Sequence, residues 1–186
     1  MQTYSIDAVS PADFDAFMAY LDDHLRENGS PEVGYFQPLS RSASSYPPER
    51  KAAFRAGLEI ALGEPGWRRA WVARAENGQI AGHIDLRSHA ERYATHRCLL
   101  GMGVHCAHRR RGLGALLIEQ AGRWAASTAL LEWIDLQVLG SNAAAIALYR
   151  QAGFIQVGEV PQMFKIDGQS FSYTTMTKPC VSQQGC

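Results

Sequence analysis

The stretch HRRRGLGALLIEQ, residues 108–120, joins three arginines and two glycines to an unbroken helix-forming run. Glycines let the backbone come close to a ligand, and the unpaired amides at a helix N-terminus attract anions. The stretch therefore predicts a helix over about 112–127 that begins at a phosphate-binding turn. The alternative is a solvated run of arginines that precedes an ordinary helix.

Other phosphate-binding motifs do not match this turn. A P-loop requires GxxxxGK[ST], and no Lys-Ser or Lys-Thr follows Gly114. A dinucleotide-binding fingerprint requires GxGxxG, and Leu117 occupies the place of the third glycine. A nucleic-acid surface requires an excess of positive charge, whereas the formal net charge of the chain is 0. The pattern that remains is Arg109-x-x-Gly112-x-Gly114.

Hydrophobic periodicity predicts the elements around this turn. Asn77-Gly78 predicts a hairpin, and Asp167-Gly168 predicts a second turn. Ser10 before Pro11 predicts the N-cap of the first helix. The expected strands are 2–10, 70–75, 79–87, 98–106, 131–140, 154–160 and 170–178, and the expected helices are 11–28, 49–62, 112–127 and 142–151. This order predicts one α/β (α+β) domain, residues 1–179, with a mixed sheet and helices on its faces, followed by a short polar tail, 180–186, that we expect to be disordered.

Arg109-x-x-Gly112-x-Gly114, between a strand and a helix, resembles the R/Q-x-x-G-x-G/A motif of the GNAT superfamily of acetyl-CoA-dependent N-acetyltransferases. The resemblance covers residues 4–178 and is tightest over 99–154. It implies a single domain with a mostly antiparallel central sheet, and it implies acetyl-CoA as the co-substrate. The pyrophosphate of the coenzyme would lie at the turn, on backbone amides of residues 110–115 and near the arginine side chains. The implied residues are Arg109, Arg110, Arg111, Gly112, Leu113, Gly114 and Ala115.

A second part of the resemblance lies on either side of the turn. In the family, the strand before the motif splays from its neighbour and pairs with the pantetheine arm, which implies Met102, Gly103 and Val104 as contact residues. The stretch LQVLGSNAAAIALYRQAGF is similar to the second family signature. It implies that Asn142 touches the cofactor and that Tyr149 donates a proton to the CoA thiolate. Considered singly, Asn142 is also a candidate helix N-cap, and Tyr149 is also a candidate core aromatic.

No general base follows from the sequence. Many relatives place a carboxylate on the strand before the motif, where this chain has Cys98, Leu99 and Leu100. His83, Asp85 and His96 are possible substitutes, and His83 and Asp85 share one face of a strand. Equally open are structural roles for His96, in a surface turn, and for Asp85, hydrogen-bonded to a neighbouring strand. The amine can also lose its proton to water. Cys106 is interpreted as structural, since a strand would turn it away from the adjacent His105.

The implied function is transfer of the acetyl group of acetyl-CoA to a primary amine by direct attack. The acceptor would be a small metabolite or an amino acid, with a peptide or protein amine as a further option. The long loop 29–48 would border the acceptor site, with Tyr35, Phe36, Arg41 and Tyr46 as candidate contacts. The alternative is a non-catalytic acyl-CoA-binding sensor that keeps the fold without turnover.

Composition limits the partners and the location. The four cysteines contain no CxxC pair, so we expect no metal site and reduced thiols in a cytoplasmic protein. No signal sequence and no apolar run of about 18–20 residues is present, so we expect no membrane association. We also expect no nucleic-acid partner. The hairpin over 164–178 could form an exposed sheet edge, which makes a homodimer possible.

Overall fold

The computed structural model describes residues 3–180, and the predicted tail beyond Cys180 lies outside these residues. One seven-stranded sheet has the order β1-β2-β3-β4-β5-β7-β6. Every neighbouring pair is antiparallel except β4 and β5, which are parallel. The predicted element order and the mixed, mostly antiparallel sheet are therefore confirmed. The strands are β1 (Ser5–Ala8), β2 (Arg68–Arg74), β3 (Ile80–Ser88), β4 (Arg97–Val104), β5 (Trp133–Leu139), β6 (Ile155–Ile166) and β7 (Gln169–Pro179).

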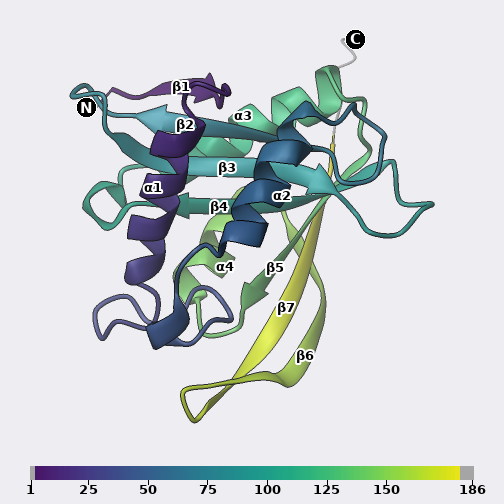
Figure 1. Ribbon diagram of the computed structural model, residues 1–186. Coiled ribbons are helices and arrows are strands. Elements are labelled where there is room, and N and C mark those ends of the chain that lie inside the picture. Colours follow the sequence, from purple (N-terminus) through teal and green to yellow (C-terminus); the bar gives the residue numbers. More distant parts are fainter. Residues whose placement is uncertain (1–2, 181–186) are drawn as a thin grey trace.

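Four α-helices cover the two faces of the sheet: α1 (Phe14–Arg26), α2 (Pro48–Glu59), α3 (Leu113–Ser127) and α4 (Ala143–Gln151). Figure 1 shows α1 and α2 in front of the sheet and α3 and α4 behind it. The first helix begins later than predicted. The Ser10 hydroxyl donates to the Asp13 carboxylate, and this contact closes a turn over 10–13 before α1 starts at Phe14. Asp13, not Ser10, is the N-cap residue.

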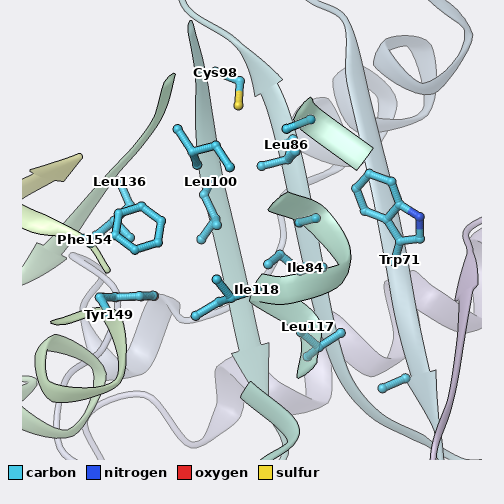
Figure 2. Packing of buried hydrophobic residues seen from close by; sticks show 14 of the residues in the cluster. Trp71, Ile84, Leu86, Cys98, Leu100, Leu117, Ile118, Leu136, Tyr149 and Phe154 are labelled. Carbon is cyan, nitrogen blue, oxygen red and sulfur yellow. The ribbon is translucent and has the colours of Figure 1, made fainter. Parts of the chain in front are cut away.

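The core consists of two main layers, one on each face of the sheet. Behind it, Leu117 and Ile118 of α3 pack on strand residues such as Ile84, Leu86 and Leu100 (Figure 2). In front, Phe17 of α1 packs against Phe54 of α2 over the neighbouring strands. These layers form because each helix has an apolar face, and that face is buried against the apolar surface of the sheet.

The parallel contact between β4 and β5 is short. Only Arg97, Cys98 and Leu99 pair with β5, and the rest of β4 has no partner on that side. At the paired end, Asp135 of β5 accepts hydrogen bonds from Arg97 Nε at 2.8 Å and from the Thr177 hydroxyl at 2.6 Å. These bonds join β4, β5 and β7 where the strands are together. From Leu100 onward, β4 and β5 diverge.

The long loop between α1 and α2 is fixed to the body of the protein. The fully buried Asn28 side chain accepts hydrogen bonds from the amides of Phe36 and Gln37, both at 2.9 Å. Its Nδ2 atom donates to the Leu39 carbonyl and the Ser44 hydroxyl, both at 3.0 Å. At the far side of the loop, the Asp167 carboxylate in the β6–β7 turn accepts from Ser40, Arg41 and Tyr35.

The hairpin of β6 and β7 forms one edge of the sheet. Asp167 and Gly168 form its turn with φ of +47° and +80°, as predicted from the dipeptide. Of the two strands, β6 is the outer one, and its Ile155, Val157 and Val160 side chains are exposed. Pairing of this edge with a second chain stays a prediction. Across residues 3–180, none of the helices combines the length and the apolar character that crossing a bilayer demands.

Candidate functional site

The turn before α3 is shaped by Gly112, whose φ of +80° lies in the left-handed region that favours glycine. The Gly112 carbonyl accepts from the amides of Ala115 and Leu116, at 3.1 and 3.2 Å. Among the described residues, no backbone carbonyl accepts from the amides of Leu113 and Gly114. These two amides therefore stand at the positive end of the helix dipole. The Ala115 amide is bonded to the Gly112 carbonyl, and its contribution to a phosphate site stays a prediction.

Gly114 has a packing role. A Cβ atom at this position would lie 2.7 Å from a methyl carbon of Leu148 in α4. Real Cβ atoms do not approach so closely, so a larger residue at this position would require the end of the Leu148 side chain to move. The two glycines of the motif thus do different things: Gly112 forms the turn, and Gly114 leaves space for the Leu148 side chain.

The three arginines of the turn also differ. Arg109 Nε donates to the Val104 carbonyl at 3.0 Å, and Arg109 Nη2 pairs with the Glu27 carboxylate at 3.0 Å. Its guanidinium is thus tied to the end of β4 and the end of α1 in this structure, and its contact with the phosphates stays a prediction. Arg110 and Arg111 are exposed beside the turn. Their position fits the same prediction.

The divergence of β4 from β5 leaves one edge of β4 open beyond Leu99. The amides of a strand point alternately to its two edges. The His105 amide donates to the Ala81 carbonyl at the β3 side. The amides of Met102 and Val104 therefore point to the other edge, toward the gap. Of the three predicted contact residues, Met102 and Val104 offer backbone amides there, and Gly103 faces β3.

Asn142 and Tyr149 lie at the two ends of α4. Asn142 Oδ1 accepts from the Ala145 amide at 3.2 Å, so its oxygen caps the helix. The Tyr149 ring packs on the Phe154 ring, with centroids 5.7 Å apart, close to Leu136 of β5 (Figure 2). Burial raises the pKa of the Tyr149 phenol well above its usual range. The phenol is therefore protonated at neutral pH and can act only as a proton donor there.

A group of aromatic and imidazole rings covers the other face of β4. His83 Nδ1 lies 3.3 Å from the Tyr20 hydroxyl, and that hydroxyl donates to the Gly103 carbonyl at 3.4 Å. The His24 ring lies between Tyr20, with which it is stacked, and Phe36, against which it is tilted. A side chain at position 103 would collide with both His24 and His83. Glycine is therefore required in β4 where these two imidazoles approach it.

The two imidazoles are neutral. Burial lowers the pKa of His83 to about 3. Burial, together with the nearby His83, lowers the pKa of His24 to about 3. His24 Nδ1 is the one buried side-chain nitrogen or oxygen in residues 3–180 that lacks a hydrogen-bond partner. A buried unpaired nitrogen is costly, so this atom is a candidate contact for a ligand or a water.

The three candidate general bases, His83, Asp85 and His96, lie in different places. Asp85 lies beside His83 on the shared face of β3, as predicted, and its carboxylate pairs with Arg68 at 3.2 Å and Arg87 at 3.4 Å. His96 is exposed, and its carbonyl accepts from Glu132 at the end of β4 that is paired with β5. His96 is therefore remote from the open edge. His83 and Asp85 border the region of Gly101 and Gly103.

The sequence of the chain matches the model of the acetyltransferase (GNAT) family over residues 34–154. The match covers both the turn before α3 and the divergence of β4 from β5. This chain belongs to the GNAT family. The GNAT family uses acetyl-CoA.

Individual relatives agree with this assignment. The catalytic subunit NAA10 of the N-terminal acetyltransferase A complex of Arabidopsis thaliana is 27% identical over 99 residues, which cover 53% of this chain and 52% of NAA10. The match thus spans about half the length of that curated relative. A GNAT acetyltransferase from Streptococcus pneumoniae has a TM-score of 0.76 at 24% identity, covering 95% of this chain and 99% of its own. Spermidine N-acetyltransferase from Vibrio cholerae, solved with CoA and spermine, has a TM-score of 0.72 at 15% identity, with 95% of each chain covered.

Sequence analysis of this GNAT protein missed His24 and misjudged Cys106. His24 follows Phe17 and Tyr20 on the apolar face of α1, at the spacing of a helix, and a polar residue in such a stripe was the available signal. Cys106 is exposed and begins a short 3-10 turn, so the expectation of a strand position was wrong. Its Sγ lies 3.9 Å from His105 Nδ1, and the Glu27 carboxylate is close to both.

Proposed function

We propose that this GNAT protein transfers the acetyl group of acetyl-CoA to a primary amine by direct attack. The observation that carries the proposal is the open edge of β4, where the Met102 and Val104 amides face the gap beside β5. That edge leads along the chain to the turn before α3. A coenzyme can therefore bind with its pyrophosphate at the helix N-terminus and its pantetheine arm along the strand.

The chemistry would depend on donors held in place before the substrate arrives. The Leu113 and Gly114 amides would bind the pyrophosphate, with Arg110 and Arg111 near it. The Val104 or Met102 amide would donate to the thioester oxygen as negative charge develops there. Tyr149 would give its proton to the departing thiolate, because its phenol stays protonated. The carbonyl carbon gains the bond to the amine nitrogen as its bond to sulfur breaks.

The acceptor amine would approach from the face of β4 that carries Gly101 and Gly103, opposite α3. It must be neutral to attack. On this face, His24 Nε2 is the ring nitrogen that lies over the bare backbone of Gly103, so it is the atom best suited to accept a hydrogen bond from the amine. With a pKa of about 3, His24 would orient the amine and would leave its deprotonation to water. No carboxylate of β4 is available for that step.

The test is release of the free CoA thiol from acetyl-CoA with a panel of amines: amino acids, aminoglycosides, polyamines and short peptides. Release with one class of amine supports the proposal and identifies the acceptor class. A thermal shift with acetyl-CoA, measured in parallel, reports binding without turnover. Stabilisation by acetyl-CoA with no release for any amine would contradict catalysis and favour the acyl-CoA sensor.

The proposal also concerns the location of the reaction. Cys98, Cys106 and Cys180 are free thiols. Because free thiols persist in reducing compartments, we propose a cytoplasmic location. Labelling with a thiol reagent directly after lysis under non-reducing conditions tests it. Blocked cysteines at that stage would contradict a cytoplasmic location.

A further inference from the structure

A cluster of one carboxylate and two guanidinium groups lies beside β4 on the acceptor face. Asp85 is central, with Arg68 Nε at 3.2 Å and Arg87 Nη1 at 3.4 Å from the same carboxylate oxygen. A Cβ atom at Gly101 would lie 2.5 Å from Asp85 Oδ2 and 3.2 Å from Arg87 Nη1. The charged groups therefore sit directly on the bare backbone of β4.

The guanidinium groups of Arg68 and Arg87 differ in their contacts and in their exposure to solvent. The Arg68 guanidinium lies over the Phe54 ring at 4.1 Å, and 19% of the Arg68 side chain is exposed. Arg87 has 35% of its side chain exposed. Within residues 3–180, its guanidinium makes one long hydrogen bond, the 3.4 Å contact from Nη1 to Asp85. Arg87 therefore has donors left for another anion, in the planar arrangement that suits a carboxylate.

The cluster carries an excess of positive charge. One carboxylate faces two guanidinium groups, and the nearby imidazoles of His24 and His83 are neutral. Asp22, whose carboxylate accepts from the Tyr46 amide, pairs with Lys51, and Asp135 pairs with Arg97. A net charge of about +1 at a partly buried site favours an anion and opposes a polycation.

The charge of Arg87 also acts on a residue of the strands beyond the gap. Burial raises the pKa of the Tyr173 phenol, and the nearby Arg87 charge opposes this shift. Tyr173 belongs to β7 and pairs with Leu139 of β5. The Arg87 charge of β3 therefore acts on a phenol of β7, on the other side of β4 and β5.

The spacing matches a small bifunctional molecule. Arg87 Nη1 lies beside Gly101, two residues along β4 from Gly103, a separation of about 7 Å at the rise of a strand. The thioester carbonyl would lie near the Met102 and Val104 amides. An amine that attacks there can carry a carboxylate that reaches Arg87.

We propose that Arg87 selects acceptors in which the amine is accompanied by a carboxylate, as in an amino acid. This inference rests on the proposed acetyl transfer and names its substrate class. Arg87 binds the carboxylate of the acceptor, and Asp85 holds the guanidinium beside Gly101. Polyamines, which offer only positive charge, are disfavoured at this position.

Matched acceptor pairs test the proposal. CoA release is measured with alanine, leucine, methionine, phenylalanine and glutamine, and with the carboxamide of each, across pH so that rates refer to the neutral amine. We expect the wild type to prefer at least one free acid about 10-fold or more in kcat/KM. Arg87→Gln should lower this acid-to-amide ratio about 10-fold through KM, and Arg87→Lys should restore part of it. Taking a ratio cancels any general loss of activity.

The control is Arg123→Gln, which removes an exposed arginine of α3 that pairs with Glu119. It should leave the ratio unchanged. Equal use of acids and amides by the wild type, or faster turnover of polyamines, would overturn the inference while acetyl transfer stands. The same ratio in Arg87→Gln as in the wild type would also overturn it. No CoA release with any amine would instead reject the proposed function, and this inference with it.

Discussion

Arg109 donates its Nε hydrogen to the Val104 carbonyl at 3.0 Å and so fixes the end of β4 beside the open edge. The same guanidinium pairs with Glu27 at the end of α1. The arginine of the family motif is therefore, in this chain, a link between β4 and α1. Its neighbours Arg110 and Arg111 are exposed to solvent beside the turn.

Replacement of Arg109 should disturb the position of β4. We expect Arg109→Gln to lower kcat/KM for acetyl-CoA about 10-fold or more, because a small displacement of the Val104 amide weakens its contact with the thioester. The salt dependence of acetyl-CoA binding should change little. In Arg110→Gln it should decrease, since a phosphate contact would be lost. Titration of both variants at two salt concentrations checks this, and a lower salt dependence in Arg109→Gln would mean that Arg109 contacts the phosphates.

Tyr149→Phe should slow turnover and leave coenzyme binding intact. The phenol would act on the leaving thiolate, so kcat should fall about 10-fold or more while the thermal shift with acetyl-CoA is retained. Because the pKa of Tyr149 lies above its usual range, loss of its proton should not lower kcat between pH 7 and 10. The matched control is Tyr93→Phe, at a side chain that is 85% exposed. An unchanged kcat in Tyr149→Phe would remove Tyr149 from the mechanism.

Stability should fall in mild acid because of His24 and His83. Their pKa values are about 3 in the folded protein. In the unfolded chain a histidine titrates near 6.5, so below about pH 6.5 the unfolded state binds protons that the folded state does not. The free energy of unfolding should therefore decrease from about pH 6.5 toward pH 3, and these groups should not change it above pH 7.

Urea denaturation at several pH values between 4 and 8 measures this dependence. His24→Gln should reduce the slope of unfolding free energy against pH by about one proton, while His96→Gln, at an exposed position, should retain the wild-type slope. Equal stability at pH 4.5 and pH 7 would show that the imidazoles are not held neutral.

Asn28→Ala should release the loop between α1 and α2. The substitution removes the hydrogen bonds to Phe36, Gln37, Leu39 and Ser44 from a fully buried position. We expect a loss of about 2–4 kcal/mol in the free energy of unfolding, together with faster proteolysis within 29–47. Asn77→Ala, in an exposed hairpin turn, should cost less than about 1 kcal/mol. Unchanged proteolysis in Asn28→Ala would mean that other contacts hold the loop.

Local patterns were enough to predict most of the fold. Asn77-Gly78 and Asp167-Gly168 determine their own turns, and the periodicity of each segment shows which face is buried. Contacts between distant residues could not be predicted in this way. Arg109 lies 82 positions from its partner Glu27, and the pairing depends on how α1 lies across β4. The ring of His24 over Gly103 and the position of Arg87 beside Gly101 have the same origin, so the acceptor face was the part that the sequence left open.

The short parallel pairing of β4 with β5 affects how the sheet opens locally. Within residues 3–180, the β1–β4 half of the sheet is connected to the β5–β7 half by three residue pairs and by the adjacent bonds from the Glu132 and Trp133 amides to the His96 carbonyl. Each half forms its own extensive antiparallel ladders, so without ligand the two should open as separate cooperative units in hydrogen exchange. A coenzyme lying along the open edge of β4 would supply the missing linkage. While acetyl-CoA is bound, it would stabilise the contact between the two halves of the sheet. Release of the product CoA would remove that stabilisation.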